Sequence, residues 1–428
     1  MKKQLSVVLI LILAAMLILS GCGGTDAEET TVQEVDMPEE SVEETEESEE
    51  EVAVPELDLK ASYDDGTYRG TYGDRGEMQI SIQFVLTDNQ ISDVRYRHLY
   101  HSGNDYREME EGDPLYGIAL QHEQVAEYLE GKSLEAIADV YAPGTIADDV
   151  DTFSGATIRG NKIVSAMKDA LNRGIYSPAN GFSTEMNEYA DGRYRGTYGD
   201  SGEMQVSIQF DIEDNHISNI SFRHLSYSGN DYRGAEEGDP LYEIAQQHIQ
   251  AVDYLEGKPL EAIFELHDTS GYVDDVDTFS GATIRGNKIF SSIMDGLNRG
   301  IYSPTNGLDP VIGDYPDGRY RGTYGDSGDM QVSIQFRLES GNLSDISFRH
   351  LYYSGNDYRE MEEGDPLYGI VQQHEQIAEY LDGKPIATIY ELHSPGDFVD
   401  DVDTFSGATI RANKVFSAIV DGLNRGIY

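Results

Sequence analysis

The heptapeptide Asp151-Thr152-Phe153-Ser154-Gly155-Ala156-Thr157 occurs three times in this chain of 428 residues. Identical copies occupy positions 277–283 and 403–409, so that each copy follows the one before it by 126 residues. A fixed period over most of a chain indicates that one structural module has been copied. An identical heptapeptide in every copy marks the part of the module where we expect its function.

The period divides the chain into three modules, which we place at residues 61–176, 187–302 and 313–428. Connectors that contain Pro, Asn and Gly begin at Ser177 and Ser303. Each module is long enough to bury a core of its own. We therefore expect three compact bodies with limited contact between them.

The first half of a module has the pattern of an antiparallel sheet. Residues 66–73 have the composition of a short strand, and in the next segment Met78, Ile80, Ile82 and Phe84 alternate with polar residues. Such alternation is typical of a half-buried strand. A turn at Asp88-Asn89 then returns the chain, so we expect a meander.

The second half of a module has helical spacing. Asp113-Pro114 resembles a helix start, and apolar residues recur from Leu115 to Leu129. A second helix is expected from Leu134, and a last helix carries a stripe of Ile163, Met167 and Leu171 before Gly174. Strands followed by helices predict an α+β fold, an antiparallel sheet with packed helices, in three tandem copies.

The start of the chain has the form of a secretory signal peptide. Lys2 and Lys3 precede an apolar run from Leu5 to Leu19, and Cys22 follows shortly afterwards. This arrangement resembles the lipobox of bacterial lipoproteins, which implies a signal peptide at residues 1–21 and lipidation of Cys22. An uncleaved membrane anchor is the alternative, although the run is shorter than the roughly 20 residues a spanning helix needs. Both interpretations place the modules outside the cytoplasmic membrane, on the outer face in a Gram-positive cell.

Composition excludes several classes of protein. Residues 22–60 are rich in Glu, Asp, Ser and Thr and predict an acidic, disordered tether. The chain carries 79 acidic and 30 basic residues, a net charge of −49, which makes nucleic acid and anionic lipid poor partners. Because Cys22 is the single cysteine, the modules have neither disulfides nor Cys-ligated iron–sulfur centres nor c-type haem.

The repeated heptapeptide lies just before the last helix of each module. Ser, Gly and Ala leave backbone amides accessible, and a helix N-terminus attracts anions through its N–H groups and partial positive charge. Ser154 or Thr157 could instead be a simple helix cap. A cap, however, tolerates Ser, Thr, Asp and Asn in turn, whereas all three copies keep the same residues.

The sequence Asp-x-x-Ser-Gly-Ala-Thr resembles the flavinylation motif of FMN-binding domains, found in subunits of sodium-pumping and related electron-transfer complexes. The resemblance extends over each module and implies that a flavin transferase joins FMN, from FAD, through its phosphate to Thr157, Thr283 and Thr409. The other residues it places at the cofactor are Ser154, Gly155, Ala156, Asp151, Ser280, Gly281, Ala282, Asp277, Ser406, Gly407, Ala408 and Asp403.

Two further charged groups accompany the motif. Where the family often has Thr or Ser, two places after the attachment threonine, this chain has Arg159, Arg285 and Arg411. An arginine there can pair with a phosphodiester or simply lie on the surface of the first helical turn. Aspartates cluster before each motif, as at Asp148, Asp149 and Asp151; we interpret them as a solvated acidic loop that binds Mg²⁺ transiently during flavin transfer, with no resident metal.

Other recurring residues leave alternatives open. Arg97-His98-Leu99 and the loop 102–107, with Tyr106, recur in all modules and either line the flavin or form a structural turn. His122, His248 and His374 lie on an apolar helical stripe, where a core role is expected rather than a zinc site.

We therefore expect a membrane-anchored electron carrier with up to three covalent FMN groups, rather than a substrate-specific enzyme. Its expected partners are the flavin transferase, a membrane dehydrogenase or quinol-linked donor and an extracellular acceptor or reductase. The alternative is a multivalent ligand-binding or adhesive surface lipoprotein without redox function.

Overall fold

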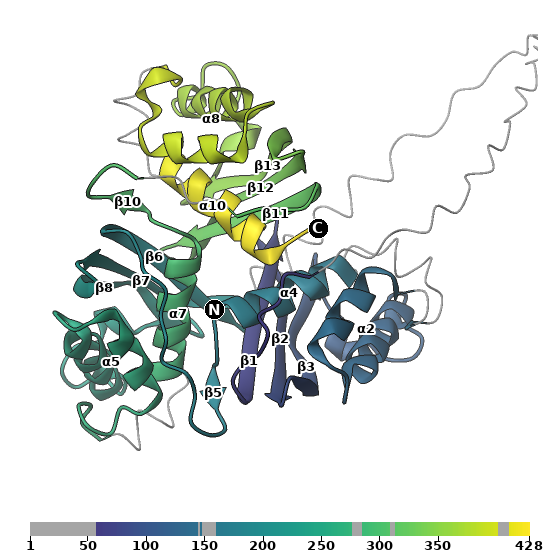
Figure 1. Cartoon of the computed structure of the whole chain (residues 1–428), viewed down its shortest axis with the longest axis vertical. Coiled ribbons are helices and arrows are strands. Elements are labelled where there is room, and N and C mark those ends of the chain that lie inside the picture. The colour runs from purple at the N-terminus through teal and green to yellow at the C-terminus, as the bar shows by residue number, and fades with distance from the viewer. Residues whose placement is uncertain (1–56, 144–145, 148–159, 276–284, 309–312, 401–410) are drawn as a thin grey trace, which may run out of the picture. The chain divides into compact units, whose positions relative to one another are not determined.

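The computed structural model describes residues 57–143, 146–147, 160–275, 285–308, 313–400 and 411–428, all of which belong to one compact unit, Val52–Tyr428 (Figure 1). In the described part of the chain no helix is both long enough and apolar enough to span a membrane. The predicted signal peptide and lipidation site, residues 1–21 and Cys22, lie outside the described residues, as does the tether up to residue 56.

Each module has the same order of main elements from its first strand to its last helix. The first module contains β1 (Gly66–Asp74), β2 (Glu77–Thr87), β3 (Gln90–His101), β4 (Asn104–Asp105), η1 (Tyr106–Glu108), α2 (Tyr116–Leu129), η2 (Leu134–Tyr141), α4 (Gly160–Asn172) and β5 (Ser177–Pro178). The second contains β6 (Gly192–Asp200), β7 (Glu203–Glu213), β8 (His216–Tyr227), β9 (Asn230–Asp231), η4 (Tyr232–Gly234), α5 (Tyr242–Leu255), η5 (Leu260–His267), α7 (Gly286–Asn298) and β10 (Ser303–Pro304). The third contains β11 (Gly318–Asp326), β12 (Asp329–Glu339), β13 (Asn342–Tyr353), β14 (Asn356–Asp357), η6 (Tyr358–Glu360), α8 (Tyr368–Leu381), η7 (Ile386–His393), η8 (Pro395–Asp397) and α10 (Ala412–Arg425).

The strands form the expected antiparallel meander, and the α+β class is confirmed. The sheet order in the first module is β4-β3-β2-β1-β5, with the equivalent order in the second. Tyr68 pairs with Phe84 and Gly70 with Ile82 across β1 and β2, so the alternating apolar residues share one face. That face is fully buried at Ile80, Ile82 and Phe84.

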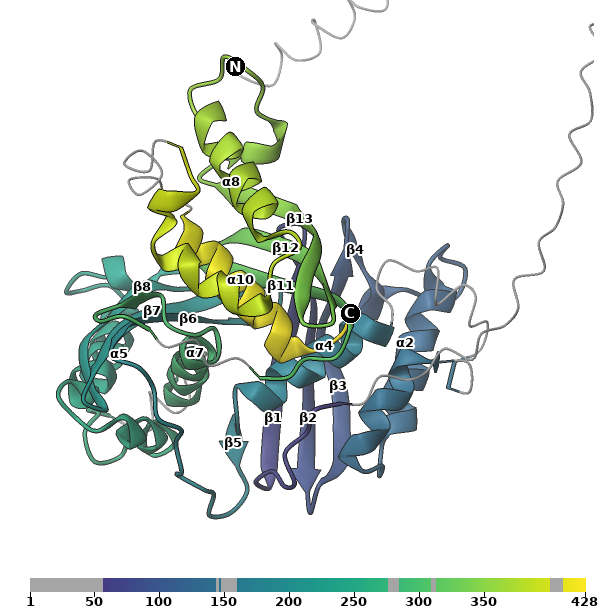
Figure 2. The same cartoon turned by 45° about the horizontal axis from the view of Figure 1, so that its top comes forward.

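The last helix of each module lies against its first two strands, as Figure 1 and Figure 2 show for α4, α7 and α10. The backbones approach closely because β1 has glycine at the contact. A Cβ on Gly70 would lie 2.1 Å from the carbonyl oxygen of Ala166 in α4. The predicted stripe of Ile163, Met167 and Leu171 is buried in this contact.

One helical prediction needs correction, and another is confirmed. The residue before α2 is Leu115, which makes no capping hydrogen bond, and Asp113 instead accepts a hydrogen bond from the backbone N–H of Glu110. Asp113 thus closes the preceding turn, and the helix begins at Tyr116. The predicted second helix does begin at Leu134, and it is a 3-10 helix, η2. It is short, and Leu134, Ile137 and Val140 all face the core.

The expectation of three bodies with limited contact is wrong. Asp200, at the end of β6, is 1% exposed and accepts hydrogen bonds from Arg97 of the first module, at 2.8 Å from Nε to Oδ1 and 2.7 Å from Nη2 to Oδ2. Arg69 and Ser81, also of the first module, reach the same carboxylate at 3.3 and 3.2 Å. A buried carboxylate needs such partners, which here come from another module.

The same contact recurs between every pair of modules. Asp326 of the third module accepts from Arg223 of the second at 2.6 Å. Asp74 of the first module accepts from Arg349 of the third at 2.8 Å, although 275 residues separate them. The direction is therefore cyclic, first to second to third and back to first, and the three modules close a ring within the unit.

Candidate functional site

The predicted attachment residues lie outside the part of the chain that the structure describes. This holds for Thr157, Thr283 and Thr409, for the Asp, Ser, Gly and Ala of their motifs, and for Arg159. Arg285 and Arg411 are described, together with the residues that lead into the second and third motifs. The candidate site is therefore built from the residues on either side of each motif.

Paired glutamines hold the segment that enters the motif. In the third module Gln376 of α8 donates from Nε2 to the Asp400 carboxylate at 2.8 Å and accepts from the Asp400 backbone N–H at 2.9 Å. Gln373, one helical turn earlier, donates to the Asp400 carbonyl at 2.6 Å. Gln250 and Asp274 make the same pair of contacts in the second module. The residue three positions before the motif is thus held on the middle helix in both modules. Asp274 and Asp400, which the sequence places in an acidic loop, therefore have structural partners.

In the second and third modules the last helix starts shortly after the motif, and the described residue before it provides no side-chain cap. Arg285 occupies the position before α7 and Arg411 the position before α10, both with extended backbone, and neither side chain caps its helix. The first backbone N–H groups of such a helix have no partner within the helix. Their direction and the helix dipole favour an anion at this end, as the motif predicts.

The tyrosine that ends each module packs against the next module, and Tyr176 and Tyr302 lie near the motif arginine of that module. Tyr302, which ends the second module, is 5% exposed and stacks on Tyr324 of the third, with ring centroids 6.1 Å apart. The guanidinium of Arg195 lies 3.9 Å from the centroid of the Tyr302 ring. Burial raises the pKa of the Tyr302 hydroxyl, and the charges of Arg195 and Arg411 partly oppose this rise. Arg411 therefore lies near a residue of the neighbouring module.

Tyr176 and Tyr428 repeat this arrangement. Tyr176 stacks on Tyr198 at 5.9 Å, and the positive charges of Arg69 and Arg285 oppose the burial that raises its pKa. Tyr428, the last residue, stacks on Tyr72 at 6.0 Å, and its carbonyl oxygen accepts a hydrogen bond from Nδ2 of Asn161 at 2.6 Å. The start of each last helix thus lies at a boundary between two modules.

A buried lysine lies on the first turn of each last helix. Lys288 Nζ donates to Gln205 Oε1 at 2.5 Å and lies 3.9 Å from the Asp200 carboxylate. Burial lowers the pKa of Lys288 to about 7, although Asp200 opposes this shift. Burial lowers the pKa of Lys414 to about 7 in the same way, with Asp326 opposing. Asp200 already faces Arg97 and Arg69, so it offsets little of the cost of charging the buried amine.

Of the two interpretations of Arg97-His98 and the loop 102–107, the structure supports the structural one. Arg97 pairs with Asp200 of the second module, and the His98 ring lies against Gly202, where an added Cβ would be 2.7 Å from Cε1. Arg107 pairs with Asp105 and donates to the carbonyl of Arg97 at 2.5 Å. Tyr106 is buried and packs near His122. Arg97 and His98 thus join the first two modules, and Arg107 and Asp105 stabilise the turn.

The core role of the helical histidines is confirmed. His122, His248 and His374 are at most 1% exposed, and Nδ1 of each contacts the carbonyl oxygen four residues earlier, at 2.6 to 2.7 Å. Burial lowers the pKa of His122 and of His374 to about 4. His122 and His374 are therefore neutral at pH 7, and all three histidines are core residues.

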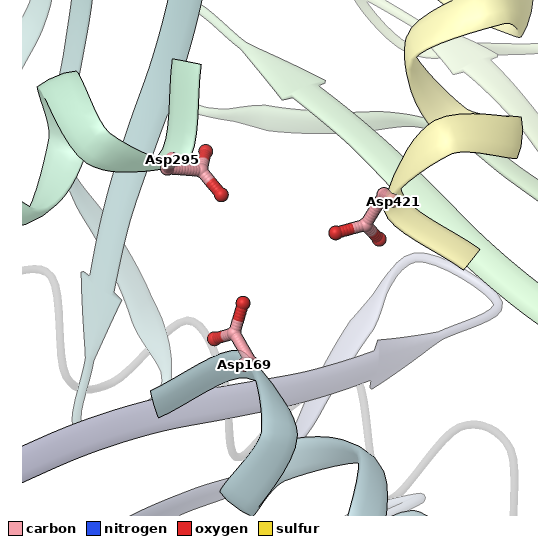
Figure 3. A group of neighbouring side chains, drawn as sticks. All are labelled: Asp169, Asp295 and Asp421. Atoms are coloured by element: carbon pink, nitrogen blue, oxygen red, sulfur yellow. The ribbon is translucent and has the colours of Figure 1, made fainter. Parts of the chain in front are cut away.

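Three carboxylates meet at the centre of the ring, where Asp169, Asp295 and Asp421 point toward one another from α4, α7 and α10 (Figure 3). The three carboxylates lie close enough together to bind a cation. Each of them, however, already pairs with the arginine four residues later in its own helix, with 2.8 Å between Nε and Oδ2. Arg173 also reaches Asp295 at 2.9 Å, and Arg425 reaches Asp169 at 3.1 Å. Three guanidinium groups balance three carboxylates, so this cluster joins the modules and is not a metal site.

These interface residues were not predicted from the sequence. Asp169 and Arg173 are spaced four residues apart on a predicted helix, which is the usual pattern of a solvated ion pair. Their recurrence in every module, as in the motif itself, is the one signal that could have marked them.

Comparison with known families adds one match. Residues 73–172 match the model of the family described as FMN-binding domain. The matched segment extends from the end of β1 to the end of α4 and includes the first motif, 151–157. No curated protein and no solved structure matched the chain.

Proposed function

Residues 73–172 belong to the FMN-binding domain family, and from this premise we propose that the protein is an electron-transfer flavoprotein with three covalent FMN groups. The observation that carries the proposal is the family match over a segment that contains a motif present, letter for letter, in all three modules. The equivalent elements and contacts of the modules support the extension from the first module to the other two.

The proposed attachment points are Thr157, Thr283 and Thr409. A flavin transferase would use FAD as donor: the threonine Oγ bonds to the FMN phosphorus, the bond between the two phosphates breaks, AMP leaves, and the hydroxyl proton passes to a base. Mg²⁺ would accompany the diphosphate of the donor and leave with it. When bound, the flavin supplies the redox chemistry, and the chain supplies its position and its electrostatic surroundings.

The ring arrangement supports a relay between fixed sites rather than between tethered bodies. Asn161, next to the start of α4, precedes the central Asp169 by eight residues, about 12 Å along a helix. Because the central carboxylate oxygens lie within 4.8 Å of one another, the helix starts of two modules are no more than roughly 36 Å apart once the two aspartate side chains are included. Three flavins at these positions would keep constant separations.

We further propose that lipidated Cys22 anchors the protein to the outer face of the membrane and that the acidic segment after it acts as a tether. A membrane dehydrogenase or a quinol-linked flavoprotein would be the electron donor, and an extracellular acceptor or reductase would be the oxidant. The net charge of −49 favours cationic acceptors such as ferric species. Oxidation of the reduced protein by ferric iron should then slow as salt is added.

The experiment that tests the function is co-expression with a flavin transferase, followed by reduction and reoxidation of the purified full-length protein in a spectrophotometer. Bound flavin that cycles between oxidised and reduced absorption supports the proposal. A colourless protein would favour the alternative, a multivalent surface lipoprotein without redox function.

A further inference from the structure

A cavity of about 70 Å³ lies where the three modules meet. Each module contributes the same four residue types to its lining: a threonine and a glycine of its first strand, a methionine of its second strand and the arginine of the central cluster. The methionines are Met78, Met204 and Met330, and all three are half-buried. Any group bound in this cavity would meet three equivalent sets of side chains.

Each methionine reaches across a boundary and packs on a glycine of the next module. A Cβ added to Gly325 would lie 2.5 Å from Cε of Met204, which is too close for two carbon atoms. The same contact recurs in the pairs Met78–Gly199 and Met330–Gly73. Because only glycine leaves room for it, the thioether end of each methionine has a defined position at the boundary.

The three methionines form a closed chain of contacts around the cavity. Gly325, which Met204 contacts, is the residue that pairs with Met330 across β11 and β12. Paired residues of antiparallel strands have Cα atoms about 4.5–5.5 Å apart. The methyl end of Met204 therefore lies beside the backbone of Met330, and the same relation leads from Met330 to Met78 and from Met78 to Met204. Three thioether groups are thus brought together around one small cavity.

The other polar groups of the lining already have partners within the chain. Nη1 of Arg173 donates to the carbonyl oxygen of Thr197 at 2.5 Å, and Arg299 and Arg425 make the equivalent bonds at 2.5 and 2.6 Å. Oγ1 of each lining threonine donates to a central aspartate at 3.1 to 3.3 Å. Among the described residues of the lining, none is Asp, Glu, His or Cys. The thioether sulfur atoms are therefore the lining atoms best suited to bind a further group.

Thioether sulfur is a soft, uncharged ligand, and such ligands favour soft ions such as Cu(I). Zn²⁺ sites in proteins consist of thiolate, imidazole or carboxylate groups, while Mg²⁺ and Ca²⁺ require oxygen ligands. The arginines beside the cavity do not exclude a cation, because each pairs at 2.8 Å with a central carboxylate. A monovalent ion adds only one unit of charge to this balanced cluster.

We propose that Met78, Met204 and Met330 bind one Cu(I) ion at the centre of the ring, with one thioether from each module. No module contains this site by itself, since each supplies a single ligand. The ion would therefore also hold the three modules together. The inference does not depend on the proposed function, because none of the three methionines belongs to a flavin motif.

The test uses the full-length protein with Cys22→Ser, because a free thiol would itself bind Cu(I). Cu(I) affinity is measured without oxygen by competition with the chromophoric chelator bicinchoninate. Ag(I) serves as a second probe, since it prefers sulfur ligands and does not change its oxidation state under these conditions. We expect one ion of either metal per chain.

Met204→Leu removes one sulfur atom and keeps the size and the apolar character of the side chain. We expect the affinity for Cu(I) to fall at least tenfold, because even the loss of an outer-shell partner costs a metal site roughly 10–100-fold in affinity. Met294→Leu is the matched control, since Met294 is a half-buried methionine of the same module that does not line the cavity. This control should leave the affinity unchanged. Thermal unfolding without metal establishes that both variants are folded.

Methyl NMR of the parent protein with ¹³C-labelled methionine locates the ion without any substitution at the site. One equivalent of Ag(I) should shift the Cε resonances of Met78, Met204 and Met330 together. The resonance of Met294 should stay in place. Single Met→Leu variants assign the resonances.

Three results would each overturn the proposal: no binding of Cu(I) or Ag(I) by the parent, equal affinities of Met204→Leu and Met294→Leu, or Cε shifts confined to methionines outside the cavity. Zn²⁺ that displaced Ag(I) would also contradict it, because Zn²⁺ would indicate oxygen or nitrogen ligands. Met204→Leu should still carry the full number of flavins after co-expression with a flavin transferase. The copper site and the flavin proposal can therefore fail separately.

Discussion

Arg173 of the first module donates to Asp295 of the second, with 2.9 Å between Nη2 and Oδ1, and both side chains are buried. Arg173 also pairs with its own Asp169 at 2.8 Å and donates from Nη1 to the carbonyl of Thr197 at 2.5 Å. One side chain thus joins two last helices and a strand of the neighbouring module. The ring depends on such residues rather than on the connectors.

Arg173→Ala should therefore destabilise the whole ring. The change leaves the carboxylates of Asp169 and Asp295 buried without this partner, and breaking a buried pair costs about 3–5 kcal/mol. The free energy of unfolding in urea measures the loss. Arg95→Ala is the matched control, because Arg95 and its partner Asp93 are both more than half exposed and should contribute less than about 1 kcal/mol. If both changes lowered the free energy of unfolding equally, the central cluster would not stabilise the ring more than an exposed ion pair does.

Gly202→Ala should test the contact between the first two modules. Gly202 has φ +89°, and an added Cβ would lie 2.7 Å from Cε1 of His98 across the boundary. Gly229→Ala is the control, since its φ of +78° carries similar strain but nothing lies within 4 Å. Both should lose about 1 kcal/mol through backbone strain, and Gly202→Ala should lose a further 1–3 kcal/mol, roughly, through the clash. Identical unfolding midpoints would contradict the contact.

Stability should fall as the pH is lowered from about 6.5 toward 4. Burial lowers the pKa of His122 and of His374 to about 4, while an unfolded histidine keeps a value near 6.5. In this window the unfolded chain binds more protons than the folded one, so protonation favours unfolding, by on the order of 3 kcal/mol for each histidine at the lower end. Urea denaturation at pH 7 and pH 5 measures the slope.

The buried carboxylates extend this loss to lower pH. Burial opposes ionisation of Asp74, but the hydrogen bond and charge of Arg349 outweigh it and lower the pKa of Asp74 below its usual value. Its contribution to stability is present above the usual carboxyl pKa range and is lost as the pH falls through the lowered pKa.

His122→Leu tests the histidine part of this pH dependence. The variant should show a smaller change in the free energy of unfolding between pH 7 and pH 5. An unchanged slope in that variant would contradict the assignment.

Much of the module could be predicted from its sequence, because the periodicity of apolar residues is local. The alternation at Met78, Ile80, Ile82 and Phe84 gave β2, and the stripe at Ile163, Met167 and Leu171 gave α4. The start of α2 was misplaced because aspartate is a common helix-capping residue, whereas the Asp113 side chain closes the preceding turn. Local propensity did not separate those two uses of an aspartate.

The ring could not be predicted, because its contacts join residues about a hundred or more positions apart. Arg97 and Asp200 are separated by 103 residues, and each has the character of a surface charge when considered alone. A repeat period establishes that modules are copies and says nothing of whether they pack together. The role of the motif residues, by contrast, is predicted from the sequence alone, and their positions lie outside the described residues.

Peptide mass spectrometry of the full-length protein made together with a flavin transferase tests the proposed flavin attachment most directly. We expect FMN on the peptides that contain Thr157, Thr283 and Thr409, and the loss of one flavin for each single Thr→Ala change. Three unmodified peptides, or a flavin count that does not change with these substitutions, would contradict it.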